Sequence, residues 1–235
     1  EKETGLCGGF GGHMHLFDSS LKFSATGIVG AGLPVVIGHA WAARLRGSDA
    51  VAVAVVGDGA VNTGAFHEAM NMAGVHRLPV IVVVENNEWA ISVPFHQASA
   101  TATIAERAPA WSAHGVRVDG TDVEAVADAF GTAVQRAREG AGPTLIEATC
   151  YRFRGHFEGD ADTYRTEEEK ERRRKEDPLE LTAQRLISRG VASAEQIDSL
   201  RSAVTAAVAD LLASVRADRS PDPATALRHV FVEVA

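Results

Sequence analysis

Two runs of small apolar residues dominate the pattern of hydrophobic and polar positions along the chain. The first covers residues 51–56 and the second residues 80–84, and both consist mainly of valine. Continuous apolar runs of this length, closed by polar residues, are typical of buried strands. Residues 61–75 between them predict a helix, so this part of the chain is expected to form two parallel strands joined by a helix.

The alternation of strands and helices continues on both sides of this unit. Further elements are expected as a helix at 31–46 ended by Gly47, a loop at 92–103 with a short helix after it, a strand at 116–118, a helix at 122–138 and a strand at 144–151. Repeated alternation of this kind predicts an α/β fold, a three-layer sandwich with a mainly parallel sheet.

The pattern changes after residue 152. Residues 153–165 have no apolar periodicity and predict a long exposed loop, and such loops are often functional. Residues 167–177 form a dense, balanced charge run with Glu and Arg at helix-neighbour spacing, for example Glu169 and Arg173. We expect a solvated helix there, and a docking or regulatory role is the alternative.

The last predicted helix begins at Ser193, because Gln196 completes a capping-box pattern with it. Apolar residues at helical spacing form one stripe, which consists of Ile197, Leu200, Val204, Val208, Leu211 and Val215. The stripe is expected to belong to the core, and contact with a partner chain is the alternative.

Composition narrows the class of protein. The chain has 235 residues, a net charge of −8 and a pI near 5.6, which argues against a nucleic-acid surface. No apolar stretch reaches the roughly 18 residues of a spanning helix, so no membrane segment is expected. Cys7 and Cys150 match no metal-site spacing, and free thiols are favoured over a bridge between them. We therefore expect a cytoplasmic protein, while any targeting segment could have been trimmed from the beginning.

Polar residues at the ends of the two valine-rich strands carry the candidate chemistry. Asp58 follows the first strand and Asn87 follows the second. The carboxyl ends of neighbouring parallel strands emerge side by side, roughly 5 Å apart, so both side chains are expected to face one crevice. Mg²⁺ prefers oxygen ligands and usually takes one or two from protein together with phosphate oxygens. The pattern predicts a magnesium and phosphate site, although Gly-Asp-Gly by itself is more often an ordinary turn.

A longer set of motifs makes the prediction specific. This chain resembles the transketolase-like superfamily in its thiamine-diphosphate signature. The matching residues are Gly57-Asp58-Gly59-Ala60 with Asn62, then Glu68-Ala69 and Asn71, then Glu85-Asn86-Asn87. Three further motifs resemble those of the alpha subunits of the two-chain 2-oxo acid dehydrogenases, a family that includes the acetoin and pyruvate dehydrogenases. These are Gly11-Gly12-His13-Met14-His15-Leu16, Gly27-Ile28-Val29-Gly30 and Tyr151-Arg152-Phe153-Arg154-Gly155-His156. The resemblance covers nearly the whole chain and implies the diphosphate-binding half of the thiamine-diphosphate fold.

The resemblance also assigns roles to particular residues. Asp58, Asn87 and the main-chain oxygen of Trp89 would bind Mg²⁺, Gly59 and Ala60 would contact the diphosphate, and Gly27 and Val29 would contact the aminopyrimidine. His156 would be the active-site histidine, with His15 as a second candidate. Asp160, Tyr164 and Arg165 are expected to order the loop around His156 when the cofactor binds.

The resemblance implies partners as well. The Glu that activates the aminopyrimidine would come from a beta subunit in an α2β2 assembly, and Glu68 and Glu85 are interpreted as structural. The acyl unit would pass to the lipoyl group of an acyltransferase. Phe157 stands where pyruvate-specific relatives have Ser, which favours acetoin, with pyruvate and branched-chain 2-oxo acids as alternatives. A non-catalytic scaffold of the same fold is the alternative function.

The sequence suggests four segments. Residues 1–26 are rich in glycine and would contact the cofactor or form a flexible terminus, and residues 27–152 would be the diphosphate- and Mg-binding core. Residues 153–177 would hold the active-site loop and the charged helix, and residues 178–235 a C-terminal helical region.

Overall fold

The computed structural model describes residues 2–225, 227 and 230. The end of the predicted C-terminal region, at residues 226, 228–229 and 231–235, lies outside the described residues. Two compact units are present. We call Ile28–Ser188 the sheet unit, and the terminal unit combines the residues up to Gly27 with those from Arg189 onward.

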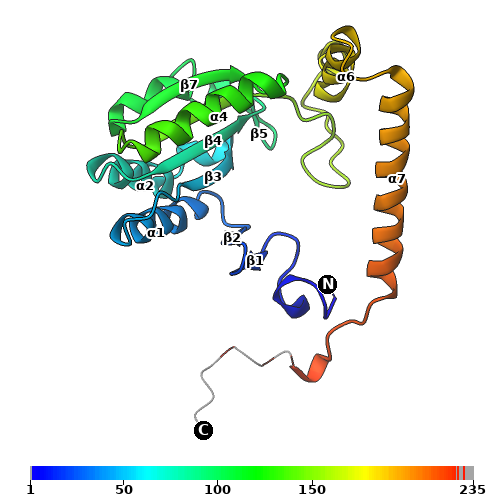
Figure 1. Ribbon diagram of the computed structural model, residues 1–235, viewed down its shortest axis with the longest axis horizontal. Helices are drawn as coiled ribbons and strands as arrows, with labels where there is room; N and C mark the ends of the chain where they lie inside the picture. Colours follow the sequence, from blue (N-terminus) through cyan, green and yellow to red (C-terminus); the bar gives the residue numbers. More distant parts are fainter. Residues whose placement is uncertain (1, 226, 228–229, 231–235) are drawn as a thin grey trace. The chain divides into compact units, whose positions relative to one another are not determined.

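A four-stranded parallel sheet is the centre of the sheet unit (Figure 1). Its strands stand in the order β3 (Ala52–Gly57), β4 (Val80–Asn86), β8 (Thr144–Thr149) and β7 (His114–Asp119). Both valine-rich runs therefore form neighbouring strands, as predicted. The expectation that the first is buried is wrong in part: β3 is an edge strand, and its Val53 and Val55 are exposed.

Helices cover the two faces of this sheet. Helices α1 (Gly32–Leu45) and α2 (Gly64–Val75) pack on one face, where Leu33 and Phe66 share a core cluster with Val82. Helix α4 (Val123–Arg138) packs on the other face, where Ala133 contacts the cluster of Ile81 and Ile146. Side chains alternate between the faces of a strand, so Ile81 and Val82 enter different clusters. The predicted three-layer α/β sandwich is confirmed.

The segments after β3 and β4 are more structured than expected. The 3-10 helix η2 (Asp58–Asn62) follows β3, and α2 begins only at Gly64 with Thr63 as its N-cap. The predicted helix start at residue 61 is thus wrong, because the turn that carries Asp58 takes up these residues. The expected loop at 92–103 contains the second strand of a short hairpin and a helix, and the short helix expected after it is η3. The elements are β5 (Trp89–Ala90), β6 (Val93–Pro94), α3 (Phe95–Ala98) and η3 (Ala105–Trp111).

No helix or strand lies between β8 and α5 (Glu167–Arg174), which confirms the long loop at 153–165. The loop is not exposed throughout, because Arg165 is buried. Helix α5 has no buried residue, in agreement with a solvated helix, and α6 (Pro178–Ser188) follows it. Among the described residues, no helix is both long enough and apolar enough to cross a membrane.

The terminal unit contains α7 (Ala194–Ala217) and several short elements. These are η1 (Leu6–Gly9), β1 (Phe17–Asp18), β2 (Phe23–Ser24) and η4 (Pro223–Thr225). Ser193 and Gln196 form the predicted capping box. The expectation that the apolar stripe of α7 belongs to the core is wrong: none of its residues is buried, and Leu200 and Leu211 are 61% and 63% exposed.

Candidate active site

Two turns at the carboxyl edge of the sheet form the centre of the candidate site. Asp58 follows β3 and Asn87 follows β4, and the parallel pairing of these strands ends with Gly57 opposite Glu85. The register therefore places the two turns at adjoining strand ends. This is the arrangement that the sequence predicted for a shared crevice.

Asp58 is the most constrained of the proposed ligands. Its side chain is almost completely buried, with 3% of the residue exposed. Burial raises the pKa of its carboxyl group, and the main-chain N–H groups of its own turn and the distant charge of Arg152 oppose that rise only in part. Within the described part of the chain, no Lys, Arg or His nitrogen lies within ion-pair distance of Asp58, whose only opposing cation is the more distant Arg152. A buried carboxylate without an adjacent cation fits a bound metal ion, which would compensate for the lost hydration.

The second turn carries Asn87 and Trp89. The Asn87 side-chain oxygen accepts a hydrogen bond from the Trp89 N–H at 3.1 Å and keeps one lone pair for another partner. Glu88 and Ile91 have left-handed backbone conformations, with φ of 66° and 58°, which turn the chain sharply into the β5–β6 hairpin. An amide oxygen and a main-chain oxygen are suitable ligands for a hard cation. Among the described residues there is no cluster of three or more His, Cys, Asp or Glu, and the proposed ligand set is of a different kind.

Gly59 brings the two turns together. A Cβ atom built at Gly59 would lie 2.9 Å from the Cβ of Ala90, so only glycine allows β5 to pack this closely on the first turn. Ala60, the next residue, is buried. The turn after β3 and the hairpin after β4 are thus in contact, although they are far apart in sequence.

The Gly-Ile-Val-Gly segment divides between the two units. Gly27 ends the first part of the terminal unit, while Val29 belongs to the sheet unit, and both residues are exposed. Gly30 is buried with φ of 80°, and a Cβ there would lie 2.3 Å from the hydroxyl of Thr63, the N-cap of α2. The end of this segment is therefore fixed to the start of α2. The aminopyrimidine contacts of Gly27 and Val29 stay a prediction.

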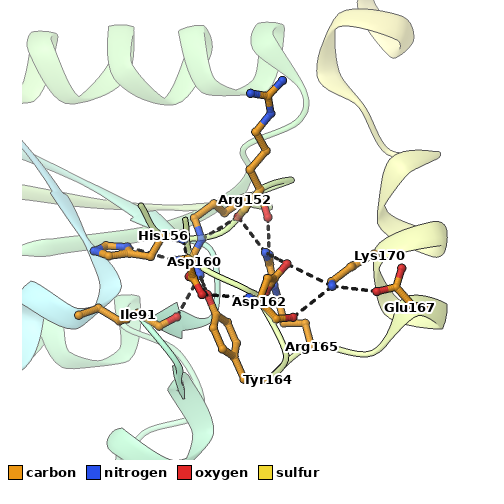
Figure 2. A network of polar contacts seen from close by, with 10 residues as sticks. Ile91, Arg152, His156, Asp160, Asp162, Tyr164, Arg165, Glu167 and Lys170 are labelled. Atoms are coloured by element: carbon orange, nitrogen blue, oxygen red, sulfur yellow. Dashed lines mark hydrogen bonds and ion pairs between the residues drawn. The ribbon is translucent and has the colours of Figure 1, made fainter. Parts of the chain in front are cut away.

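The loop at 153–165 carries His156, which is exposed. Figure 2 shows it beside Arg152 and Asp160. The main-chain N–H of His156 donates to the Asp160 carboxylate at 2.7 Å. Its ring Nδ1 lies 3.3 Å from a nitrogen of Arg152. Because a guanidinium can only donate, Nδ1 is the acceptor in this contact and the ring proton of a neutral His156 resides on Nε2. His156 therefore presents Nε2–H as a hydrogen-bond donor, and proton transfer from this nitrogen requires the doubly protonated ring, in which the contact of Nδ1 with Arg152 is released.

Arg152 connects this loop to the second ligand turn. One of its nitrogens donates to the main-chain oxygen of Ile91 at 2.9 Å and to the Tyr164 hydroxyl at 2.7 Å. The Trp89 and Tyr164 rings lie 5.3 Å apart, which adds an apolar contact between the same two segments. The sequence prediction included Tyr164 and missed Arg152, although Arg152 belongs to a motif that the resemblance rested on.

Arg165 anchors the other end of the loop. It forms an ion pair with Asp162 at 2.6 Å and donates to the main-chain oxygens of Arg152 and Arg154. Lys170 of α5 also pairs with Asp162, at 3.3 Å (Figure 2). Arg173 of α5 reaches Glu88 at 3.3 Å, between the two proposed ligands of the second turn. Asp162, Lys170 and Arg173 escaped the sequence prediction, because their pairing depends on how the loop folds back.

His15, Glu68 and Glu85 complete the predicted set. His15 lies in the terminal unit, is exposed, and donates its main-chain N–H to Gly12, so its catalytic assignment stays a prediction. Glu68 and Glu85 are exposed residues of α2 and β4. Cys7 and Cys150 are free thiols, as expected.

These features define an α/β protein with a buried Asp58 and the amide of Asn87 at the carboxyl edge of its sheet, and with His156 in the loop that follows the sheet. The chain belongs to the Dehydrogenase E1 component family, whose sequence profile matches residues 3–224. This confirms the family that the motifs indicated and places the chain among subunits of oxidoreductases.

Individual relatives agree with this assignment. The alpha subunit of acetoin:2,6-dichlorophenolindophenol oxidoreductase from Cupriavidus necator is 42% identical over 98% of this chain and 70% of its own length. The corresponding subunit from Bacillus subtilis is 49% identical over 72% of this chain and 51% of its own length. The pyruvate dehydrogenase E1 component subunit alpha from Porphyra purpurea is 40% identical over 94% of this chain and 66% of its own length. All three are named as enzyme subunits, which favours the catalytic function over the scaffold.

Proposed function

We propose that this chain is the alpha subunit of a thiamine-diphosphate-dependent dehydrogenase and holds the cofactor through Mg²⁺. Asp58, Asn87 and the main-chain oxygen of Trp89 would bind the metal ion. Gly59 and Ala60 would contact the diphosphate, and Gly27 and Val29 the aminopyrimidine. The observation that carries the proposal is Asp58, a buried carboxyl group at the strand end next to Asn87, for which the described residues supply no adjacent cation.

When bound, thiamine diphosphate supplies the carbon nucleophile that attacks the substrate carbonyl. The chain itself contributes positioning and proton transfer. His156 would donate a hydrogen bond from Nε2–H to the reacting oxygen while Arg152 occupies Nδ1, and it would deliver that proton from the imidazolium form, in which the Arg152 contact is released. The hydrogen bonds of Asp160, Tyr164 and Arg165 would hold this histidine in place. His15 remains the second candidate for proton transfer.

Acetoin is the substrate that we propose, with cleavage of its central carbon–carbon bond. Two observations support it: relatives named for acetoin are 42% and 49% identical to this chain, and Phe157 occupies the loop position after His156. Pyruvate or a branched-chain 2-oxo acid is the alternative, since a pyruvate dehydrogenase subunit is 40% identical.

A beta subunit would complete the active site by supplying the Glu that activates the aminopyrimidine, in an α2β2 assembly. The relatives are named as alpha subunits, and the exposed apolar stripe of α7 offers surface for a second chain. A lipoyl-bearing acyltransferase would accept the acyl unit. The chain spans 51% to 70% of the length of these three relatives. We propose a cytoplasmic location for the assembly.

Titration calorimetry with thiamine diphosphate and Mg²⁺ tests the cofactor site. Wild type should release heat, whereas Asp58→Ala and Asn87→Ala should bind at least about 100-fold more weakly because each loses a metal ligand. Glu85→Gln is the matched control, since it alters an exposed carboxylate at the same edge of the sheet. Equal binding by wild type and Asp58→Ala would contradict the proposed metal site.

Activity requires reconstitution with candidate beta chains. The isolated chain should be inactive, and the complex should turn over acetoin faster than pyruvate or branched-chain 2-oxo acids in side-by-side assays. His156→Ala should reduce kcat by about 100-fold or more if this residue transfers a proton. Full turnover by that variant would remove His156 from the mechanism.

A further inference from the structure

Glu147 is a fully buried acidic residue on β8, outside the proposed ligand set. One carboxyl oxygen accepts a hydrogen bond from the Asn86 side chain at 2.7 Å. The other accepts the main-chain N–H groups of Ile104 and Ala105, each at 2.9 Å. Both oxygens are thus satisfied by groups from two different segments of the chain.

The main effect of these three hydrogen bonds to Glu147 is to fix the positions of the segments that they join, and their contribution to the stability of the fold is smaller. Burial of a carboxyl group costs free energy, and apolar residues of similar size often replace buried ionic groups without loss of stability. The only cation paired with Glu147 in the described structure is Arg117, at 3.7 Å, and its side chain is 49% exposed. What an apolar residue could not reproduce is the fixed separation between β8, Asn86 and the start of η3.

The Asn86 side chain leads to the second ligand turn. While its nitrogen donates to Glu147, its oxygen accepts the Glu88 N–H at 2.9 Å. Both ends of the amide are therefore used, and the left-handed conformation of Glu88 is held in place. Asn87 lies between these two residues, so Glu147 fixes the turn that carries a proposed metal ligand.

Helix η3 leads to the first ligand turn through Arg107. Its guanidinium donates to Ser99 at 2.6 Å, to Thr101 at 3.0 Å and to the side-chain oxygen of Asn62 at 2.8 Å. Asn62 ends η2, the 3-10 helix that begins at Asp58. Each of these acceptors is uncharged, so the guanidinium serves as a multiple donor in fixed geometry.

We propose that Glu147 and Arg107 form one brace between the two ligand turns and thereby set the cation affinity of the site. Both are positioning residues, since neither is a proposed ligand. The inference rests on the proposed function, because it concerns the same metal site. The brace would act on cation affinity only by keeping the oxygen ligands of the two turns at a fixed separation.

Mn²⁺ is a paramagnetic substitute for Mg²⁺, and its binding can be titrated by electron paramagnetic resonance on the full chain with saturating thiamine diphosphate. Glu147→Gln and Arg107→Met should each weaken Mn²⁺ binding by about 10-fold to 100-fold, as loss of supporting contacts around a metal typically does. Arg117→Met should stay within about twofold, because that arginine is half exposed, pairs with Glu147 and, among the described residues, has no hydrogen bond or ion pair with either ligand turn.

The double variant separates a brace from two independent contributions. If both residues act as one unit, Glu147→Gln with Arg107→Met should lose no more affinity than the weaker-binding single variant. Additive losses would overturn the brace, as would normal Mn²⁺ affinity in variants whose stability to urea has fallen. If Glu147→Gln fails to fold, the Mn²⁺ affinity of Arg107→Met compared with that of Arg117→Met still tests the brace.

Failure of the proposed function would give a different result from failure of the brace. Absence of Mn²⁺ binding in wild type would refute the metal site and the brace together. Binding in wild type with equal affinity in Arg107→Met would refute the brace alone. In the reconstituted complex, the brace variants should need more metal for half-maximal activity while kcat at saturating metal stays near that of wild type.

Discussion

The guanidinium of Arg152 donates a hydrogen bond to the Tyr164 hydroxyl at 2.7 Å, and that hydroxyl donates to the Asp160 carboxylate at 2.7 Å. The same carboxylate oxygen accepts the main-chain N–H of His156. The conformation of the loop at His156 therefore depends on a hydroxyl eight residues further along the chain. Tyr164 is the residue through which this dependence can be tested.

Tyr164→Phe removes the hydroxyl and keeps the ring against Trp89. We expect the loop to lose about 1.5–3 kcal/mol of local stability, as is typical for one hydrogen bond to a charged group. Limited proteolysis at residues 152–165 should become faster, and kcat of the reconstituted enzyme should fall. Glu158→Gln is the control, since it alters an exposed residue of the same loop. Unchanged cleavage rates in Tyr164→Phe would contradict the role of the network.

The pH dependence of the loop should follow Asp160. Hydrogen bonds from the N–H groups of Asp162 and His156 and from Tyr164 lower the pKa of this carboxyl group from 3.8 to about 2. A lowered pKa means that its contribution is complete above the unfolded value and is lost as the pH falls through the folded value. Loop protection in hydrogen exchange should therefore be constant above pH 4 and fall towards pH 2. A transition centred near the ordinary value would show that these bonds are absent in solution.

Asp58→Asn should stabilise the chain without cofactor and remove its response to metal. Burial raises the pKa of Asp58, so the ionised form opposes folding, and stability is lost as the pH rises through the folded value. Asparagine keeps the shape and removes the charge. Thermal denaturation at pH 7 should give a higher Tm than wild type without ligands, and no further rise on addition of Mg²⁺ and thiamine diphosphate. A lower Tm for the unliganded variant would contradict this account.

Gly59→Ala tests the contact between the two turns. The new Cβ would lie 2.9 Å from that of Ala90, so the hairpin must shift, at a cost of about 1–3 kcal/mol. In Gly59→Ala, both the cofactor affinity measured by calorimetry and the stability measured by chemical denaturation should fall. Gly64→Ala, where a Cβ meets no atom within 4 Å, is the matched control and should be neutral or slightly stabilising. Equal affinity in both variants would show that the turns need not stay close.

The two cysteines should react with iodoacetamide at very different rates. Burial, together with the charges of Glu85 and Asp58, raises the pKa of the Cys150 thiol to about 11, whereas Cys7 is exposed. With that pKa, only about 0.1% of Cys150 is thiolate at pH 8. Mass spectrometry after timed alkylation should find Cys7 modified first. Comparable rates would show that the surroundings of Cys150 are open to solvent.

The sequence determined the layers of the sheet unit. Both valine-rich runs of this chain form strands, and the capping residues Asp122 and Ser193 specify where α4 and α7 begin, because these signals act within a few residues. The motif spacing also sufficed to place Asp58 and Asn87 at neighbouring strand ends. Local chemistry of this kind can be deduced without knowledge of the rest of the fold.

Only the tertiary structure decided which distant groups meet. Nothing near Glu147 in the sequence indicates that its carboxyl group joins Asn86 to the start of η3, nor does the loop motif indicate that Arg152 reaches Ile91. The exposure of the α7 stripe was equally undetermined, because an apolar helix face has the same pattern whether the same chain or another one covers it. Hydrogen bonds between distant segments depend on strand order and on how loops fold back, and no short stretch of sequence contains that information.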